Sequence, residues 1–157
     1  MTTHRFSVIP AAYVYLLRPP TRLGGVEEVL LQLRQGTGYR DGHWAAAAAG
    51  HVERGESVYD AALREAAEEV GVTEVGLQPW CAMQRTAPGD DPVDERVDYF
   101  FVARTWVGTP QIMEPAKCAD LQWCGLDTLP SPVVPHEGRV LESLRLGSTP
   151  PIVVEGF

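Results

Sequence analysis

The chain has 157 residues, of which 45% are hydrophobic and 22% are charged, a composition that excludes a disordered protein. This length predicts one domain, residues 1–157, that buries roughly two thirds of the surface exposed by its unfolded chain. The formal net charge of −8 argues against a large nucleic acid partner, because such binding depends on many contacts between basic side chains and phosphates.

The first half of the chain predicts a hairpin followed by a loop. Residues 6–17 and 28–34 are rich in strand-forming residues, and the prolines and glycines between them indicate a turn. The glycine-rich segment 36–44 then predicts a loop. The alanine run 45–49 favours a helix by propensity, but the flanking glycines favour a short connection, so we interpret it as extended.

Residues 58–70 carry the clearest helix pattern. Ser57 and Asp60 fit a capping box, and Gly71 fits the glycine that commonly ends a helix. Apolar residues recur at helical spacing and predict a buried stripe on this helix, which leaves its glutamates on the other side or at the borders. The stripe consists of Tyr59, Ala62, Leu63, Ala66 and Val70.

The second half predicts three strands and a second helix. Strands are expected at 77–86, 97–107 and 121–126, and a helix at 136–147. The acidic segment 87–96 between the first two strands predicts a mobile loop, and no element is predicted for the tail. Strands interleaved with two separate helices predict a mixed sheet covered on both faces, an α/β/α sandwich of the α/β class.

Several features indicate the setting of the protein. The apolar start of the chain is interrupted by His4, Arg5 and Pro10, so no membrane span is expected. Cysteines occur only three times and without the spacing of a metal site, which favours a reducing cytoplasm over a disulfide framework. Residues 1–40 carry a net charge of +3, so the remainder carries −11; one part can meet phosphates while the other holds cations.

Glu65, Glu68 and Glu69 lie at spacings that put them on one face of the predicted helix, near its C-terminal end. Each like-charge pair costs a few tenths of a kcal/mol, and the negative end of the helix dipole adds a similar penalty. This arrangement therefore indicates a positive partner at that face.

The segment 50–72 contains a longer pattern. Gly50 is followed by five residues and Glu56, then seven residues and Arg64-Glu65, two alanines, Glu68-Glu69, Val70, Gly71 and Val72. This pattern resembles the Nudix box of the Nudix hydrolase family and agrees at all seven fixed Gly, Glu and Arg positions. Ala66 is smaller than the aliphatic residue usual there, and Ala48 and Ala49 replace a proline and a small residue common before the box. Segment 105–130 is similar to MutT-like members.

The resemblance implies a divalent cation, Mg²⁺ or Mn²⁺, which prefers oxygen ligands and substrate phosphates. Glu65, Glu68, Glu69 and the carbonyl of Gly50 would be its ligands. The implied reaction is attack of water on phosphorus in a diphosphate linkage of a small nucleotide. Arg64 would hold the loop and the glutamates in place, and Glu56 would have a structural role.

A carboxylate must accept a proton in this reaction, and family members differ in which one does so. Glu65 is the first candidate and Glu114, in the segment similar to MutT-like members, is the second. Asp94 and Glu95 in the acidic loop are further alternatives.

Other residues have two interpretations each. Arg34 either contacts a substrate phosphate or borders solvent. Trp44 and Trp106 either belong to the core or stack on a base. Three of the four histidines, His43, His51 and His136, lack partners at ligand spacing, which favours surface or capping positions over metal binding.

The resemblance leaves the substrate open. A MutT-like action on nucleoside triphosphates is favoured, and ADP-ribose, to which Pro88 points faintly, or a nucleotide sugar is the alternative. A non-catalytic nucleotide- or protein-binding module would have no need of all three glutamates. An isomerase of a diphosphate lipid would need a reactive cysteine, for which Cys118 is the candidate. Monomer and homodimer both stay open.

Overall fold

A mixed eight-stranded sheet organises residues 4–157, the part of the chain described by the computed structural model. The elements in chain order are β1 (Ile9–Arg18), β2 (Glu28–Arg34), β3 (Trp44–Ala46), β4 (Ala48–His51), α1 (Val58–Val70), β5 (Leu77–Arg85), the 3₁₀ turn η1 (Pro92–Asp94), β6 (Arg96–Ala103), β7 (Cys118–Gly125), α2 (Pro135–Leu146) and β8 (Ile152–Glu155).

Strand β1 lies at the centre of this sheet, between neighbours of both directions. It pairs in parallel with β6 from Ile9 to Leu16, and antiparallel with β4 at its start and with β2 at its end. The main strand order is β3-β2-β1-β6-β5-β8, while β4 pairs with β1 and β7 pairs with β2. A strand covered on both faces is apolar almost throughout, which explains the continuous burial from Ala11 to Leu17.

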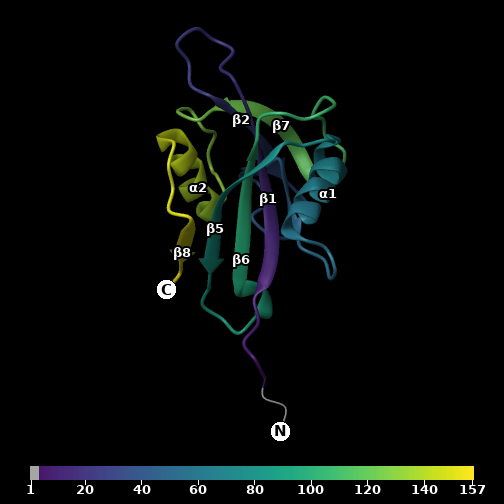
Figure 1. The fold of residues 1–157 in the computed structure, drawn as a ribbon, viewed down its shortest axis with the longest axis vertical. Coiled ribbons are helices and arrows are strands. Elements are labelled where there is room, and N and C mark those ends of the chain that lie inside the picture. The colour runs from purple at the N-terminus through teal and green to yellow at the C-terminus, as the bar shows by residue number, and fades with distance from the viewer. Residues whose placement is uncertain (1–3) are drawn as a thin grey trace.

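The two helices cover opposite faces of the sheet (Figure 1). Alternating β1 side chains divide the core: Val14 and Leu16 pack with residues of α1, and Tyr15 packs with residues of α2. The predicted α/β/α sandwich is therefore confirmed. None of the helices in residues 4–157 is long and apolar enough to cross a membrane.

Helix α1 has the predicted bounds. Ser57 and Asp60 form the predicted capping box, and Gly71 ends the helix at a φ of 71°. The predicted stripe is partly wrong, because Tyr59 and Leu63 are exposed. The buried face consists of Ala61, Ala62, Glu65, Ala66 and Val70. The small alanines pack against Val14 of β1 and Ala48 of β4.

Other elements differ from prediction in their limits. The alanine run is extended, as expected, and contributes to two short strands, β3 and β4. The predicted strand 97–107 ends at Ala103, and the predicted strand 121–126 begins at Cys118. Segment 87–96 contains η1, and the tail, for which no element was predicted, forms β8 in parallel with β5.

Candidate functional site

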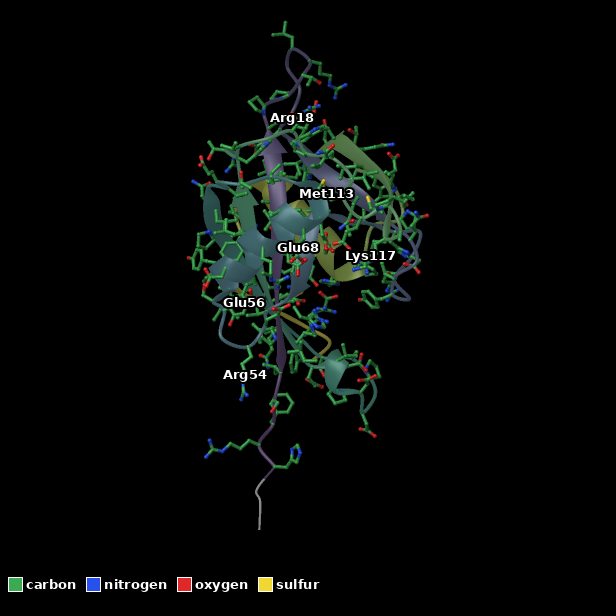
Figure 2. All side chains as sticks on the ribbon, turned by 90° about the vertical axis from the view of Figure 1, so that its right-hand side faces the viewer. Arg18, Arg54, Glu56, Glu68, Met113 and Lys117 are labelled. Atoms are coloured by element: carbon green, nitrogen blue, oxygen red, sulfur yellow. The ribbon has the colours of Figure 1, made fainter. Side chains whose placement is uncertain are left out.

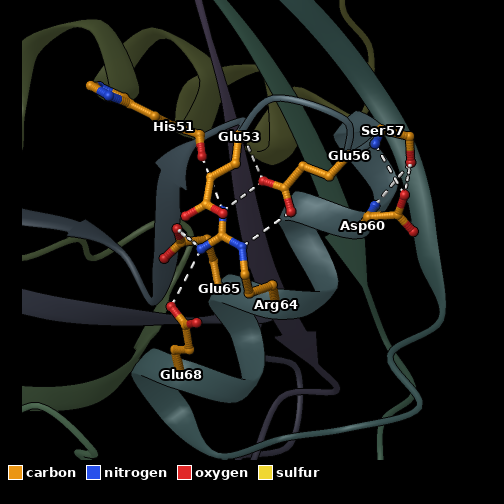
Figure 3. A network of polar contacts seen from close by, with 8 residues as sticks. All are labelled: His51, Glu53, Glu56, Ser57, Asp60, Arg64, Glu65 and Glu68. Carbon is orange, nitrogen blue, oxygen red and sulfur yellow. Dashed lines mark hydrogen bonds and ion pairs between the residues drawn. The ribbon is translucent and has the colours of Figure 1, made fainter.

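Arg64 of α1 binds three glutamates of segment 50–72 through one guanidinium (Figure 3). Its Nε and Nη2 donate to the two carboxylate oxygens of Glu56, at 3.1 and 2.8 Å, and Nη2 also donates to the carbonyl of His51 at 3.0 Å. Nη1 donates to Glu65 at 2.6 Å and to Glu68 at 3.3 Å. Arg64 thus ties the loop before α1 to the acidic face of the helix.

Glu65 is buried against the backbone of Gly50. A Cβ atom at position 50 would collide with the Glu65 carboxylate, and the φ of Gly50 is not positive, so glycine is required here for space rather than for backbone conformation. Burial raises the pKa of Glu65, while the hydrogen bond from Arg64 acts in the opposite direction. The Glu65 carboxylate of α1 therefore lies in direct contact with β4 at Gly50.

Glu69 lies one turn further along α1 and is held by Gln32 of β2. The Gln32 amide donates to Glu69 Oε2 at 2.9 Å and to the carbonyl of Ala46 at 2.9 Å. Burial, followed by the charge of Glu65, raises the pKa of Glu69 to about 8. Neighbouring glutamates raise the pKa of both carboxyl groups, Glu68 and Glu114 that of Glu65, and Glu65 and Glu114 that of Glu69, so a cation is stabilised at this partly buried place.

The donor set fits a hard divalent cation. The candidate ligands are carboxylate oxygens and a backbone carbonyl, and no sulfur or imidazole ligand is among them, as Mg²⁺ or Mn²⁺ prefers. Within residues 4–157, no group of three or more acidic, histidine or cysteine side chains converges closely enough to hold an ion without movement. The Glu68 side chain is 55% exposed, and its contact with Arg64 is long, at 3.3 Å, so its carboxylate can turn toward an ion.

Glu114 and Glu69 line one small cavity of about 330 Å³, together with Gln32, Arg34 and Cys118. Glu114 pairs with Lys117 at 2.9 Å, and its negative charge contributes to raising the pKa values of Glu65 and Glu69. Figure 2 views this side of the molecule, and both Glu68 of α1 and Lys117 are labelled there. The predicted alternative Glu114 thus lies within electrostatic reach of the acidic helix face.

A larger cavity of about 730 Å³ adjoins the small one, since Arg34 and Ala49 line both. Gly50 and His51 line it next to the acidic face, and four arginines line it as well: Arg34, Arg40, Arg85 and Arg96. Arg34 is predicted to bind substrate, and its guanidinium donates to the carbonyl of Tyr39 at 2.9 Å and to the Thr37 hydroxyl at 3.0 Å. Acidic and basic groups therefore border two neighbouring cavities.

The alternatives in the acidic loop 87–96 are placed differently from each other. Asp94 lines the large cavity, whereas Glu95 accepts a hydrogen bond of 2.7 Å from the Thr86 hydroxyl. Among the candidate proton acceptors, Glu114 lines the small cavity and Asp94 lines the large one, while Glu65 lies against Gly50 and within electrostatic reach of Glu114.

One interpretation from the sequence is wrong, and one that was left open is decided in favour of the core. His136 is buried rather than a surface or capping residue, because it packs against Tyr13 of β1, whose hydroxyl lies 3.2 Å from Nε2. Burial lowers the pKa of His136 to about 3, so it is neutral. Trp44 is buried in the core, so it is not available to stack on a base, while the partly buried Trp106 already stacks on Trp123.

Two buried polar residues were missed. Gln32 interrupts the apolar strand β2, and a polar residue in such a run is a signal that can be recognised in the sequence. Glu137 accepts hydrogen bonds of 2.7 Å from the Tyr15 hydroxyl and the Ala46 amide, and burial raises its pKa to about 7. Its position in the first turn of a helix is an ordinary one for an acid, so the sequence gives no signal.

Residues 9–144 match the NUDIX domain family. The chain belongs to the Nudix hydrolase family. Its segment 50–72 is therefore a Nudix box, and the expectation that the protein is an enzyme of this family is confirmed. The chain is 30% identical over 106 residues to the uncharacterized Nudix hydrolase YvcI of Bacillus subtilis, covering 66% of each chain.

Two further similarities broaden the picture of this Nudix chain. An isopentenyl-diphosphate delta-isomerase of Cereibacter sphaeroides is 32% identical over 124 residues, which cover 76% of this chain and 69% of that protein. The crystal structure of a MutT NUDIX hydrolase from Burkholderia pseudomallei matches with a TM-score of 0.67 and 26% identity, over 83% of this chain and 96% of the other.

Proposed function

We propose that this chain is a metal-dependent pyrophosphohydrolase that cleaves a diphosphate linkage in a small nucleotide. The observation that carries the proposal is the pair of carboxylates Glu65 and Glu69, oriented by Arg64 and Gln32, of which Glu65 lies against Gly50 of the large cavity and Glu69 lines the small one. The proposal treats residues 1–157 as a single domain; residues 1–3 of it lie outside the described residues.

Glu65, Glu68, Glu69 and the carbonyl of Gly50 are the proposed ligands of Mg²⁺ or Mn²⁺. When bound, such a cation offsets charge on the bridging phosphates and lowers the pKa of a bound water. Glu65 is the first candidate to accept the proton of the attacking water and Glu114 the second. Arg64 keeps Glu65 in place, and Arg34 contributes positive charge where the two cavities meet.

The first substrate assignment is a nucleoside triphosphate, as in MutT-like proteins. ADP-ribose or a nucleotide sugar is the alternative. Support for these two alternative substrates is at the level of the fold. The NUDIX domain of Shewanella oneidensis NrtR complexed with ADP ribose is only 19% identical to this chain, and a UDP-X diphosphatase is only 17% identical. The cavity of about 730 Å³ next to the box is large enough for a small nucleotide.

A panel of nucleoside triphosphates, ADP-ribose, nucleotide sugars and coenzyme A, assayed with and without Mg²⁺ or Mn²⁺, tests the proposal. We expect turnover of at least one compound that requires the metal. Glu68→Gln should lower this turnover at least about tenfold. The matched control is Glu142→Gln, because Glu142 is also an exposed helical glutamate paired with an arginine.

The same substrate panel also distinguishes the proposed enzyme from the alternative functions. No hydrolysis of any compound would favour a non-catalytic nucleotide- or protein-binding module, and hydrolysis without metal would contradict the proposed centre.

An isomerase of a diphosphate lipid is the second candidate function. The similarity to isopentenyl-diphosphate delta-isomerases and the presence of Cys118 and Glu114 in one cavity favour it. Burial raises the pKa of the Cys118 thiol, however, and the thiol donates a hydrogen bond of 3.1 Å to the carbonyl of Asp120, which makes it a poor acid–base group at neutral pH. Conversion of isopentenyl diphosphate that is abolished in Cys118→Ser would support this function.

We also propose the cytoplasm as the location. Cys81, Cys118 and Cys124 are free thiols, and burial raises the pKa of each. Thiols of this kind suit a reducing compartment.

A further inference from the structure

The loop between β2 and β3 has an unusual backbone. Gly36, Gly38 and Gly42 have positive φ values, and so does Arg40, at 50°. A left-handed conformation is unfavourable for a residue with a Cβ atom, and such residues concentrate at ligand sites. Arg40 therefore occupies a position where glycine or asparagine would be less strained.

Asp41 fixes this loop. Its carboxylate accepts hydrogen bonds from the Thr37 amide at 3.1 Å, the Thr37 hydroxyl at 2.5 Å and the Gly38 amide at 3.1 Å. These bonds lower the pKa of Asp41, so it stays ionised at neutral pH. Arg34 adds a bond to the carbonyl of Tyr39. The conformation of the loop is thus set by contacts within the protein.

The loop presents an aromatic ring and a free guanidinium to the large cavity. Tyr39 is 49% exposed, and its ring centre lies 5.6 Å from the guanidinium carbon of Arg34 and 6.0 Å from that of Arg40. Both Tyr39 and Arg40 line the cavity that also contains Gly50.

The other arginines of this cavity are engaged with the protein. Arg85 and Arg96 form ion pairs with the buried Asp98, and Arg34 bonds to the loop itself. Within residues 4–157, the Arg40 side chain makes no hydrogen bond and no ion pair, so all its donors are free for a ligand.

We propose that Tyr39 and Arg40 form a binding subsite in which the tyrosine ring stacks on a nucleobase and the guanidinium binds a phosphate of the same nucleotide. Every base has a π-face, so stacking favours nucleotides over other diphosphates without selecting among bases. A guanidinium binds phosphate by charge-assisted hydrogen bonds. The subsite deepens the proposed function, on which it rests for the nucleotide class, but its binding does not require turnover.

Calorimetry in metal-free buffer, where hydrolysis is excluded, tests the subsite with two probes: adenosine 5′-diphosphate and inorganic pyrophosphate. Tyr39→Leu should weaken binding of the nucleotide at least about fivefold, the lower end of the loss expected for one stacked base, and leave pyrophosphate binding within about twofold. Arg40→Gln should weaken binding of both probes.

Two control substitutions are matched in exposure. Tyr59 on α1 is 47% exposed, and Arg22 is exposed in the β1–β2 loop; neither lines the cavity. Tyr59→Leu and Arg22→Gln should leave both affinities unchanged. Asp41→Ala, which releases the loop without touching the ligand, should weaken nucleotide binding, and Asp41→Asn should weaken it less if the amide oxygen preserves part of the network.

Three results would overturn the subsite: no nucleotide binding to the wild type at millimolar concentration, unchanged nucleotide affinity in Tyr39→Leu, or equal weakening of both probes in that variant. The proposed function is tested separately, by turnover in the substrate panel. Turnover with a KM unaffected by Tyr39→Leu would overturn the subsite alone, whereas nucleotide binding without any turnover would overturn the enzyme alone.

Discussion

The side-chain amide of Gln32 donates a hydrogen bond of 2.9 Å to Glu69, which lies 37 residues later in the chain. The same amide nitrogen donates to the carbonyl of Ala46 on the neighbouring strand, so both of its hydrogen atoms have acceptors. The orientation of this amide is therefore fixed by β2 and β3, and it fixes a carboxylate of α1 in turn.

Gln32→Leu should lower the affinity for Mg²⁺ about 10- to 100-fold, because Glu69 loses the group that orients it. The free energy of unfolding should fall by about 1–3 kcal/mol, since the buried carbonyl of Ala46 loses its donor. Calorimetric titration with Mg²⁺ and denaturant unfolding measure the two effects. Gln122→Leu, on the adjacent strand β7, is the control with an exposed glutamine. Unchanged metal affinity in Gln32→Leu would show that Glu69 needs no such support.

Gly50→Ala should reduce turnover at least about tenfold while the protein still folds. The new Cβ atom would collide with the Glu65 carboxylate, so that side chain must move, whereas the backbone at position 50 can accept alanine. Gly138→Ala is the control with the opposite expectation. Its position in α2 has open space, and the helix should gain about 0.5–1 kcal/mol of stability with normal turnover. Normal turnover in Gly50→Ala would remove the close contact with Glu65 from the proposed mechanism.

Glu137→Gln should remove part of the pH dependence of stability. Burial raises the pKa of Glu137 from an ordinary value near 4.5 to about 7 in the folded protein, so the folded state holds a proton that the unfolded state releases. This contribution to stability is fully present below pH 4.5 and is lost as the pH rises through 7. Between pH 5 and pH 8 the wild type should lose about 2–3 kcal/mol more than the variant.

Denaturant unfolding at several pH values measures this difference. The comparison of slopes isolates Glu137, because Glu65 and Glu69 titrate in both proteins. Parallel curves for the two proteins would show that the buried carboxyl does not change its protonation between pH 5 and pH 8.

Glu65→Gln should lower kcat by roughly 10²–10⁴, the range of a lost general base, whereas Glu114→Gln should lower it less than about tenfold. Glu65 is fixed by Arg64 and Gly50, while Glu114 lines the small cavity and is paired with Lys117. Steady-state kinetics on the substrate found in the panel measure both. Lys117→Gln removes the ion pair but keeps the Glu114 carboxylate. This variant therefore separates the role of Glu114 as the ion-pair partner of Lys117 from its role as a candidate proton acceptor. The reverse order of effects would assign the proton to Glu114.

Local signals in the sequence were sufficient for α1. The capping box at Ser57, the terminal Gly71 and the helical spacing all lie within one segment, and the predicted bounds agree with the structure. The position of helices on both faces of the sheet could also be predicted, because it follows from the alternation of strands and helices along the chain.

Features decided by distant contacts could not be predicted in this way. Strand β8 has only four residues, and its identity depends on pairing with β5, about 70 residues earlier in the chain. His136 looks like an ordinary residue at the start of a helix, and only its contact with Tyr13 of β1 shows that it is buried. The bond between Gln32 and Glu69 likewise depends on how β2 and α1 meet.

The pairing of β1 has a consequence for synthesis of the chain. Its antiparallel neighbours β2 and β4 follow soon after it, but its parallel neighbour β6 begins only at Arg96. Until that strand leaves the ribosome, the central strand has one open, strongly apolar edge that can associate with other nascent chains. Non-local parallel pairing of this kind slows folding, so the productive yield of the protein should depend on chaperones that cover the first hundred residues.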